Sequence, residues 1–316
     1  MKLVCLFCLA CLGMLILASV ACSQQVAITI DDLPSHGTLP PGVTRDDIAK
    51  SILKALKDAG APKVYGFVNA SKLEQHPEDI EVLKLWRSAG FPLGNHTYAH
   101  LSLNDSTVEE FDRNIAANEH VLKSLMGRGD WRWFRYPFLW EGDTLEKRHA
   151  VRQYLHDHKY HVAQVTLDFE DYLWNAPYAR CAQNSDAASI EWLKSSYMNT
   201  AAQYIALDRQ MAKLVYGREI RHVLVLHLGG FETVMLPQLL AFLKEQGFTF
   251  VTLPEAEKDS AYKSDPDVPL KDGGTLLDQM MEAKHITFPP NSKPYAQLDA
   301  FCKEARPASL NHAPKP

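Results

Sequence analysis

The sequence predicts an α/β protein with a parallel sheet, and its strand count favours a barrel. Short β-rich runs alternate with amphipathic helical stretches along the body of the chain, and such alternation calls for parallel strands joined by helices. The predicted strands cover residues 26–30, 63–68, 91–94, 133–135, 161–166, 222–227 and 249–252. Seven strand–helix units match a barrel better than an open doubly wound sheet, which stays an alternative.

Amphipathic helices fill several of the intervals between these strands. Their ends are marked by N-capping residues and by glycines, which favour the left-handed backbone that closes a helix. Two have both ends marked: 44–58, capped by Thr44 and stopped before Gly60, and a helix opened by a capping box of Ser106 and Glu109 and stopped before Gly127. A third, 233–246, carries leucines at helical spacing and is stopped by Gly247.

Length and composition indicate a folded globular protein. The 316 residues are 46% hydrophobic and 22% charged, which excludes wholesale disorder, a collagen-like repeat and a small disulfide scaffold. The formal net charge is −5, and no basic run suited to a phosphate backbone is present. Nucleic acid is therefore not an expected partner.

The N-terminus has the pattern of a secretory signal. A lysine precedes an apolar stretch over 3–21, and Ser19 and Ala21 fit the small positions of a signal-peptidase site. We predict a signal peptide over 1–21 and a secreted, periplasmic or cell-envelope protein. The alternatives are a single membrane span, since the stretch is long enough to cross a bilayer, and a lipoprotein acylated at Cys22. The expected membrane contact is limited to such a lipid anchor or an uncleaved signal.

Cysteine usage agrees with export. Four of the six cysteines lie in or next to the predicted signal peptide, which leaves Cys181 and Cys302 in the folded part. Two cysteines in an oxidising compartment can pair, but spacing alone cannot place their Cα atoms within bridging distance. A disulfide and two free thiols both remain open.

The chain changes character near residue 259. From there it is rich in proline, lysine and aspartate, which is typical of an irregular tail that is wrapped on the body or partly free. The predicted organisation is a signal peptide over 1–21, a single folded domain over 22–258 and a C-terminal extension over 259–316.

Ionisable side chains follow five of the predicted strands. Parallel strands deliver their following loops to one face, so these side chains should meet there. They are Asp31 and Asp32, His96 and His100, Arg135, Asp168 and Asp171, and His227. Each alone also has an ordinary explanation as a turn, a helix cap, a surface charge or a core histidine. Together, on one face, they predict a reactive site.

The pattern fits a catalytic metal centre. His96 and His100 are four residues apart, so both imidazoles can point at one ion, and a nearby carboxylate completes a three-ligand set with an open position. A second carboxylate can accept a proton from water, and a histidine across the site can donate one. Asp31, Asp32 and His227 suit these tasks. No glutamate follows His96, which argues against the zinc-protease motif.

Five segments resemble the motifs of the polysaccharide deacetylases, the NodB-homology or carbohydrate esterase 4 family. They occur in the family's order and span roughly residues 26–255. They are Ile28-Thr29-Ile30-Asp31-Asp32, Asn95-His96-Thr97-Tyr98-Ala99-His100, Phe134-Arg135-Tyr136-Pro137-Phe138, Asp168-Phe169-Glu170-Asp171-Tyr172 and Leu226-His227.

The resemblance implies a distorted (β/α)7 barrel and a role for each motif residue. By this likeness Asp31 is the general base, Asp32, His96 and His100 bind the metal, Arg135 orients the base, Asp171 pairs with the acid His227, and the Phe138 backbone N–H holds the oxyanion. Tyr172 stands where the family usually has tryptophan, and Trp174 follows two residues later. We expect both to contact sugar.

The resemblance also implies an activity. The expected reaction is metal-dependent removal of N-acetyl groups from an amino-sugar polysaccharide or cell-wall glycan of the chitooligosaccharide or peptidoglycan type. Zinc suits the donor set best, and cobalt and nickel also fit it. The alternatives are an O-acetyl esterase acting on acetylated xylan or another glycan, and a catalytically inactive glycan-binding module. The intact set of motif residues argues against the inactive module.

Overall fold

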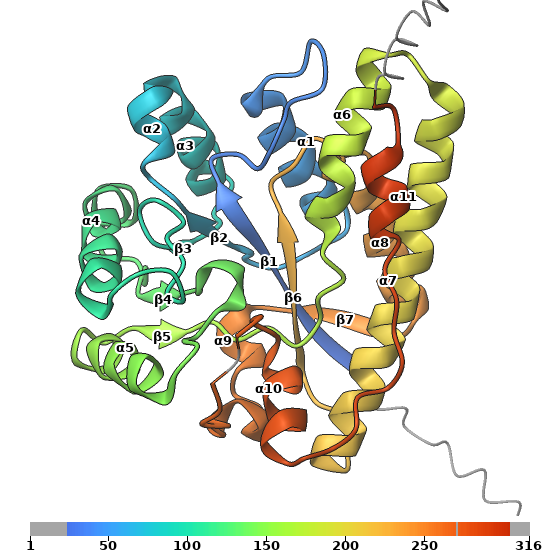
Figure 1. Ribbon diagram of the computed structural model, residues 1–316. Coiled ribbons are helices and arrows are strands. Elements are labelled where there is room, and N and C mark those ends of the chain that lie inside the picture. The colour runs from blue at the N-terminus through green and yellow to red at the C-terminus, as the bar shows by residue number, and fades with distance from the viewer. Residues whose placement is uncertain (1–23, 270, 304–316) are drawn as a thin grey trace, which may run out of the picture.

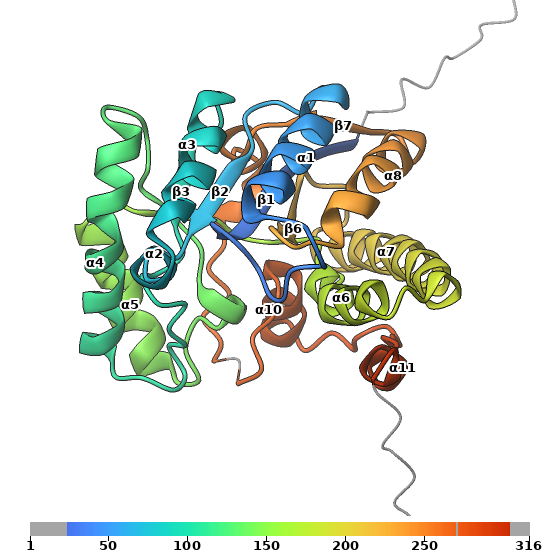
Figure 2. The ribbon, with the colours of Figure 1, turned by 90° about the horizontal axis from the view of Figure 1, so that it is seen from above.

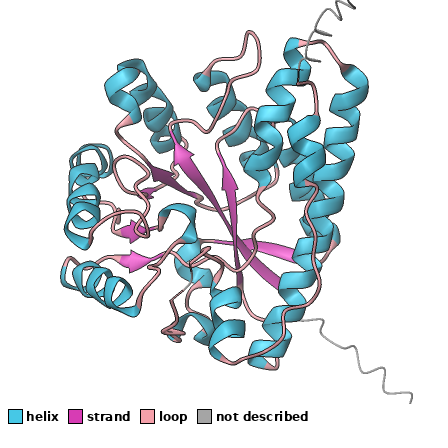
Figure 3. Ribbon diagram, viewed as in Figure 1, coloured by secondary structure: helices cyan, strands magenta, loops and turns pink. Residues whose placement is uncertain are grey.

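The computed structural model describes residues 24–269 and 271–303, and its strands form one curled parallel sheet (Figures 1 and 3). The strands are β1 (Gln24–Leu33), β2 (Tyr65–Val68), β3 (Leu93–Asn95), β4 (Trp133–Phe134), β5 (His161–Val162), β6 (His222–His227) and β7 (Phe248–Val251). The predicted signal peptide and Cys22 lie outside the described residues. Within the described part, no helix combines the length and apolarity needed to span a membrane.

β1 pairs with three strands of the sheet. The sheet order is β5-β4-β3-β2-β1-β6, and β7 pairs with the first residues of β1. Beyond β5, an isolated bridge between Leu167 and Leu224 joins the far end of the sheet to β6 and nearly closes the curl. The seven strands and this curl confirm the predicted distorted (β/α)7 barrel.

Helices surround the curled sheet (Figure 2). The main helices are α1 (Arg45–Asp58), α3 (Ile80–Ser88), α4 (Val108–Met126), α5 (Leu145–Asp157), α6 (Asn175–Gln183), α7 (Ala187–Tyr216) and α8 (Glu232–Glu245). Shorter ones are α2 (Lys72–Gln75), α9 (Leu253–Ala256), α10 (Leu276–Ala283) and α11 (Tyr295–Ala300). α1 begins at the predicted N-cap Thr44 and buries Ile48, Ile52 and Leu56. This apolar face is the one that the sequence pattern predicts.

The capping box of α4 lies one residue later than predicted. The Thr107 hydroxyl accepts from the Glu110 backbone N–H, and the Glu110 carboxylate accepts from the Thr107 N–H. The Ser106 hydroxyl instead donates to the Ser102 carbonyl, 2.7 Å away. The prediction of Ser106 and Glu109 is therefore wrong, because Ser106 is engaged in the preceding turn.

The C-terminal extension is partly helical and packs against α7. Its helix α10 places Leu276, Leu277, Met280 and Met281 in an apolar cluster with residues of α7 that include Met211. α7 thus contacts the main core through residues such as Tyr197 and the extension near its C-terminal end. The expectation of an irregular tail is wrong for α10 and α11, while wrapping on the body is confirmed.

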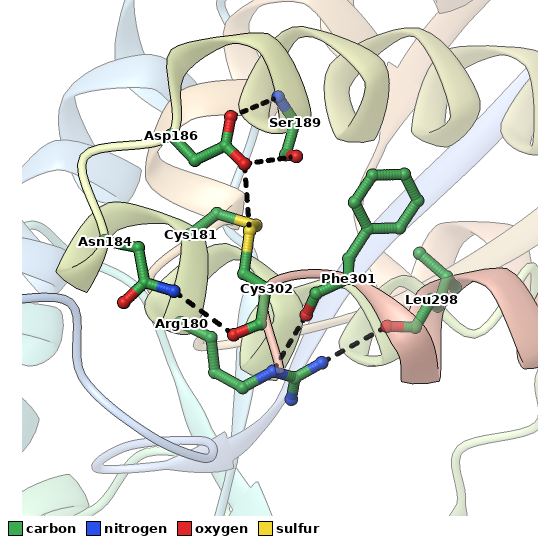
Figure 4. Close-up of a disulfide and its surroundings, with 8 residues drawn as sticks. All are labelled: Arg180, Cys181, Asn184, Asp186, Ser189, Leu298, Phe301 and Cys302. Carbon is green, nitrogen blue, oxygen red and sulfur yellow. Dashed lines mark hydrogen bonds between the residues drawn. A yellow bond between two sulfur atoms is a disulfide. The ribbon is translucent and has the colours of Figure 1, made fainter. Parts of the chain in front are cut away.

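A disulfide joins the extension to the barrel (Figure 4). Cys181 on α6 and Cys302 are bridged, with their Cα atoms 5.1 Å apart. Beside the bridge, the Arg180 guanidinium donates to the carbonyls of Leu298 and Phe301 at 3.2 and 3.0 Å. The pairing that the spacing left open is thereby decided in favour of a bridge.

Replacing Cys181 and Cys302 together by serine should lower the free energy of unfolding, by up to about 4 to 5 kcal/mol, because the bridge closes a loop of 121 residues. Denaturant unfolding of the oxidised wild type and the variant measures the difference. Thiol titration of the denatured, unreduced wild type is the control, with Cys22 counted separately. Two reactive thiols from Cys181 and Cys302 would show that the bridge does not form.

Candidate functional site

The C-terminal ends of the strands open into one cavity of about 700 Å³. Asp31 and Asp32 come from β1, His227 ends β6, and His96 and His100 follow β3. All five line the cavity. The structure therefore brings together side chains that lie up to 196 positions apart in the sequence, on the face where parallel strands deliver their loops.

Asp32, His96 and His100 form a set of metal-ligand atoms. The Nε2 atoms of His96 and His100 lie 3.8 and 3.5 Å from Asp32 Oδ1, and the three ligand atoms lie within 4.8 Å of one another. Asp32 Oδ1 is buried and has no hydrogen-bond partner among the described residues. Burial lowers the pKa of His96 to about 4 and that of His100 to about 3, so both imidazoles are neutral near pH 7. The set fits a divalent cation.

Neighbouring backbone holds these ligands in place. His96 Nδ1 donates to the Arg135 carbonyl at 2.8 Å, which leaves Nε2 free for a metal. The Asn69 amide donates to the His96 carbonyl at 2.6 Å. Asp32 and His100 both have left-handed backbone, with φ of 68° and 52°. Non-glycine residues rarely adopt this conformation, and when they do they are often found at functional sites.

Asp31 is held by a buried arginine. Arg135 Nη1 lies 3.2 and 3.3 Å from the two Asp31 carboxylate oxygens, and Nη2 donates to the Thr29 hydroxyl at 3.1 Å. Burial raises the pKa of Asp31, and the charge of Arg135 opposes that rise. The arginine thus fixes the carboxylate beside the ligand set, as a general base requires.

Asp171 holds His227 through two hydrogen bonds. Its Nδ1 lies 2.8 Å from one Asp171 oxygen, and its backbone N–H donates to the other, also at 2.8 Å. Burial by itself would lower the pKa of His227, but the Asp171 carboxylate outweighs it and raises the pKa to about 10. The imidazole is therefore protonated at neutral pH.

Aromatic side chains form part of the cavity wall. The Phe138 ring is 51% exposed and stands edge-on to the His100 ring, with centroids 4.4 Å apart. The Tyr172 ring lies 4.9 Å from that of His227. Trp174 is instead fully buried, and its indole N–H donates to the Ser196 hydroxyl. Trp174 is therefore not a sugar contact. It lies two residues after Tyr172 in the 3₁₀ turn (Asp171–Trp174), and the turn points its side chain into the core.

Two residues at the metal-ligand set were not predicted from the sequence. His36 Nδ1 lies 2.6 Å from Asp32 Oδ2, and Lys72 Nζ lies 3.7 Å from Asp32 Oδ1. Burial would raise the pKa of Asp32, but Lys72 and the His36 hydrogen bond hold it well below its usual range. His36 lies in the loop directly after β1, and this position could have identified it as a candidate site residue from the sequence. Lys72 lies on α2 and belongs to no motif.

Three solved structures share the fold. The polysaccharide deacetylase Bc1974 from Bacillus cereus aligns at 16% identity over 72% of this chain and 91% of its own, with a TM-score of 0.51. A chitin deacetylase from the fungal pathogen Colletotrichum lindemuthianum aligns at 21% identity over 74% and 88%, with a TM-score of 0.50. BA3943 from Bacillus anthracis, a carbohydrate esterase 4 family pseudoenzyme, aligns at 17% identity over 74% and 66%, also with a TM-score of 0.50. At these identities the likeness establishes the fold.

A sequence comparison adds a likeness to one family over part of the chain. No curated protein sequence matches the chain. Residues 19–163 match the sequence model described as polysaccharide deacetylase. This region carries Asp31, Asp32, His96, His100 and Arg135. His227 lies beyond it in the sequence and lines the same cavity, and its buried partner Asp171 also lies beyond it. Residues 19–163, a little under half of the chain, are thus similar in sequence to the polysaccharide deacetylase family.

Proposed function

We propose that this protein is a metal-dependent hydrolase that removes N-acetyl groups from an amino-sugar polysaccharide or cell-wall glycan. The observation that supports this most directly is the arrangement around the metal-ligand set. Arg135 fixes a carboxylate on Asp31, and Asp171 keeps His227 protonated, within the cavity that holds Asp32, His96 and His100. Two titratable groups with opposite protonation states beside one metal site suit amide hydrolysis.

The attack on the acetamide uses Asp31 as the base. A divalent ion held by Asp32, His96 and His100, zinc by preference, supplies Lewis-acid chemistry at the acetyl carbonyl and lowers the pKa of water. Asp31 takes a proton from the attacking water, whose oxygen forms a bond to the carbonyl carbon. Arg135 keeps the Asp31 carboxylate oriented through contacts at 3.2 and 3.3 Å.

The second half of the reaction uses His227 as the acid. The Phe138 backbone N–H donates to the oxyanion of the tetrahedral intermediate. His227 then passes its proton to the sugar nitrogen while the carbon–nitrogen bond breaks, which yields acetate and an amino sugar. Phe138 and Tyr172, at the cavity wall, contact the sugar that carries the acetamide.

We also propose that the protein acts outside the cytoplasm. The predicted signal peptide over 1–21 supports this, and so does the bridge between Cys181 and Cys302, because disulfides form and persist mainly in oxidising compartments. In this organisation residues 22–258 form the catalytic domain and 259–316 its extension. A glycan of the cell envelope or of the surroundings is then within reach.

Acetate release from three acetylated glycans tests the activity. We expect release from acetylated chitooligosaccharide or peptidoglycan in the presence of a divalent ion, and less from acetylxylan, which carries only O-acetyl groups. Exclusive release from acetylxylan would favour the esterase instead. No release from any of the three, by protein that binds a stoichiometric ion, would favour the inactive glycan-binding module.

His227→Ala should reduce N-deacetylation more than O-deacetylation. An amine needs a proton to leave, whereas an alkoxide is a less demanding leaving group. We expect about a 10²–10⁴-fold loss of kcat on an N-acetyl substrate, a smaller loss on an O-acetyl substrate, and unchanged metal content. Asp171→Asn is the companion variant: it removes the charge that raises the pKa of His227 to about 10, so the alkaline limb of the pH profile should move to lower pH. Normal N-deacetylation by His227→Ala would contradict this assignment.

A further inference from the structure

The cavity extends beyond the proposed catalytic residues to the C-terminal extension, which lines part of it. Its far part is lined by Asp168, Tyr204, Asp208, Asp278, Lys293 and Tyr295. The last three belong to the extension, and all six lie outside the region matched by the family model. The whole cavity, at about 700 Å³, is within the usual range of about 300–1,000 Å³ for small-ligand sites, so it has room beyond the acetamide.

The extension is fixed in this position by contacts along its length. The Leu276 N–H donates to the Val165 carbonyl at 2.8 Å, and Lys293 Nζ lies 3.0 Å from a Glu170 oxygen. Gly273 passes so close to Trp140 that an added Cβ would lie 2.2 Å from the indole Cδ1. The disulfide holds the far end. The extension is therefore a fixed part of the cavity wall.

This far part carries more acidic than basic groups. Asp168, Glu170, Asp208 and Asp278 line the cavity, and Lys293 is the only lysine or arginine that lines it among the described residues. Lys293 is already engaged by Glu170, and its Nζ lies 4.4 Å from the Tyr204 ring centroid. Among the described residues, Asp168, Asp208 and Asp278 form no ion pair with a basic side chain, although Asp278 Oδ2 accepts hydrogen bonds from the Thr275 N–H and hydroxyl at 2.8 and 2.7 Å.

Asp208 has a free oxygen in this space. Its side chain is buried, with the residue 4% exposed, and it accepts one hydrogen bond, at Oδ2 from the Asp168 N–H at 3.3 Å. For its Oδ1 the described residues provide no partner. Burial and the neighbouring Asp278 raise the pKa of Asp208 well above its usual range. Oδ1 is not one of the fully buried atoms that lack a partner, so it is open to the cavity, where a ligand can pair with it.

The spacing of these carboxyls disfavours a metal ion. Among the described residues, only Asp32, His96 and His100 bring three ligand atoms within 4.8 Å of one another. A ligand that pairs with these carboxyl groups must therefore carry its positive charge on a group larger than a metal ion. Tyr204 and Tyr295 add aromatic surface, and such rings pack well against sugar and attract cations.

We propose that the extension completes a second binding site, in which Asp208 and Asp278 hold the ammonium group of an amino sugar next to the ring that carries the acetamide. The inference rests on the proposed deacetylase function and specifies its substrate. The preferred substrate is a partly deacetylated glycan, in which a free amine lies beside an acetylated residue. Prior N-deacetylation must then supply that amine.

Two chitobioses test the proposal: the fully acetylated disaccharide and one that carries a single acetyl group and one free amine. With full-length, metal-loaded protein we expect kcat/KM to be higher for the amine-bearing disaccharide. Asp208→Asn should lower that value by about tenfold or more, since hydrogen bonds to charged groups are the strong ones. The value for the fully acetylated disaccharide should stay within about twofold. Asp267→Asn, an exposed aspartate of the extension that does not line the cavity, is the matched control and should change neither.

Equal losses on the two disaccharides, or no loss on either, would overturn the ammonium site and leave the deacetylase function standing. Calorimetric titration with glucosamine and with N-acetylglucosamine gives a readout that does not depend on turnover. We expect glucosamine to bind more tightly to the wild type than to Asp208→Asn, and N-acetylglucosamine to bind both alike. Failure of acetate release together with this selective glucosamine binding would refute the catalytic proposal alone.

Discussion

His96→Ala and His100→Ala should each lose most of the bound divalent ion and nearly all hydrolytic activity. Each variant removes one of three ligands whose donor atoms lie within 4.8 Å of one another, and two protein ligands hold an ion poorly. Metal analysis of the wild type should give about one equivalent per chain. Acetate release, measured on the same samples, should fall in parallel with metal content.

The control for this experiment is His156→Ala. His156 lies on α5 with a largely exposed side chain and is not part of the cavity. It should keep both the ion and the activity. Thermal unfolding monitored by circular dichroism would separate loss of metal from loss of fold. Full metal retention by both His96→Ala and His100→Ala would remove these residues from the metal site.

Asp31→Asn should keep the ion but lose about 10²–10⁴ in kcat, the usual contribution of a positioned acid or base. Asparagine preserves the shape of the side chain and cannot accept the proton of water. Asp31 is not part of the ligand set formed by Asp32, His96 and His100, so metal content should not change. Asp32→Asn is the contrasting variant and should lose the ion.

Metal content and turnover measured together decide between these roles. A metal-free Asp31→Asn protein would mean that Asp31 is a ligand. An Asp32→Asn protein that keeps its ion and shows only a lower kcat would mean that Asp32 is the base and not a metal ligand. Loss of the Arg135 contact would also disturb Asp31, so Arg135→Lys should lower kcat while metal content stays near that of the wild type.

The strands and the grouping of the candidate site residues could be predicted because their signals are local. Buried strands such as β6 are short apolar runs, and reactive residues follow them directly, so Asp31 and His227 could be placed on one face without any contact being known. The prediction of the α4 capping box was wrong by one residue, because a serine and a threonine are adjacent there and both can cap a helix. The prediction that Trp174 contacts sugar was wrong because the local backbone turn decides which side chain reaches the cavity.

The extension could not be predicted to line the site. Its contacts, such as Leu276 with Val165 and Lys293 with Glu170, join residues more than 100 positions apart. Proline-, lysine- and aspartate-rich sequence carries no periodicity that would indicate such a partner. The acidic character of the far cavity arises only when Asp208 on α7 meets Asp278 on α10, which is a property of tertiary packing.

The pairing of β1 with three strands affects how the chain must fold as it leaves the ribosome. β1 is made early, yet two of its three partner strands, β6 and β7, begin only at His222 and Phe248. Roughly 190 residues separate the end of β1 from β6, which takes about 10 to 40 s of translation. During that interval one edge of β1 has no native neighbour, and unpaired edges invite association between nascent chains. We expect chains truncated before β6 to need chaperone protection and the full-length chain to fold only after release.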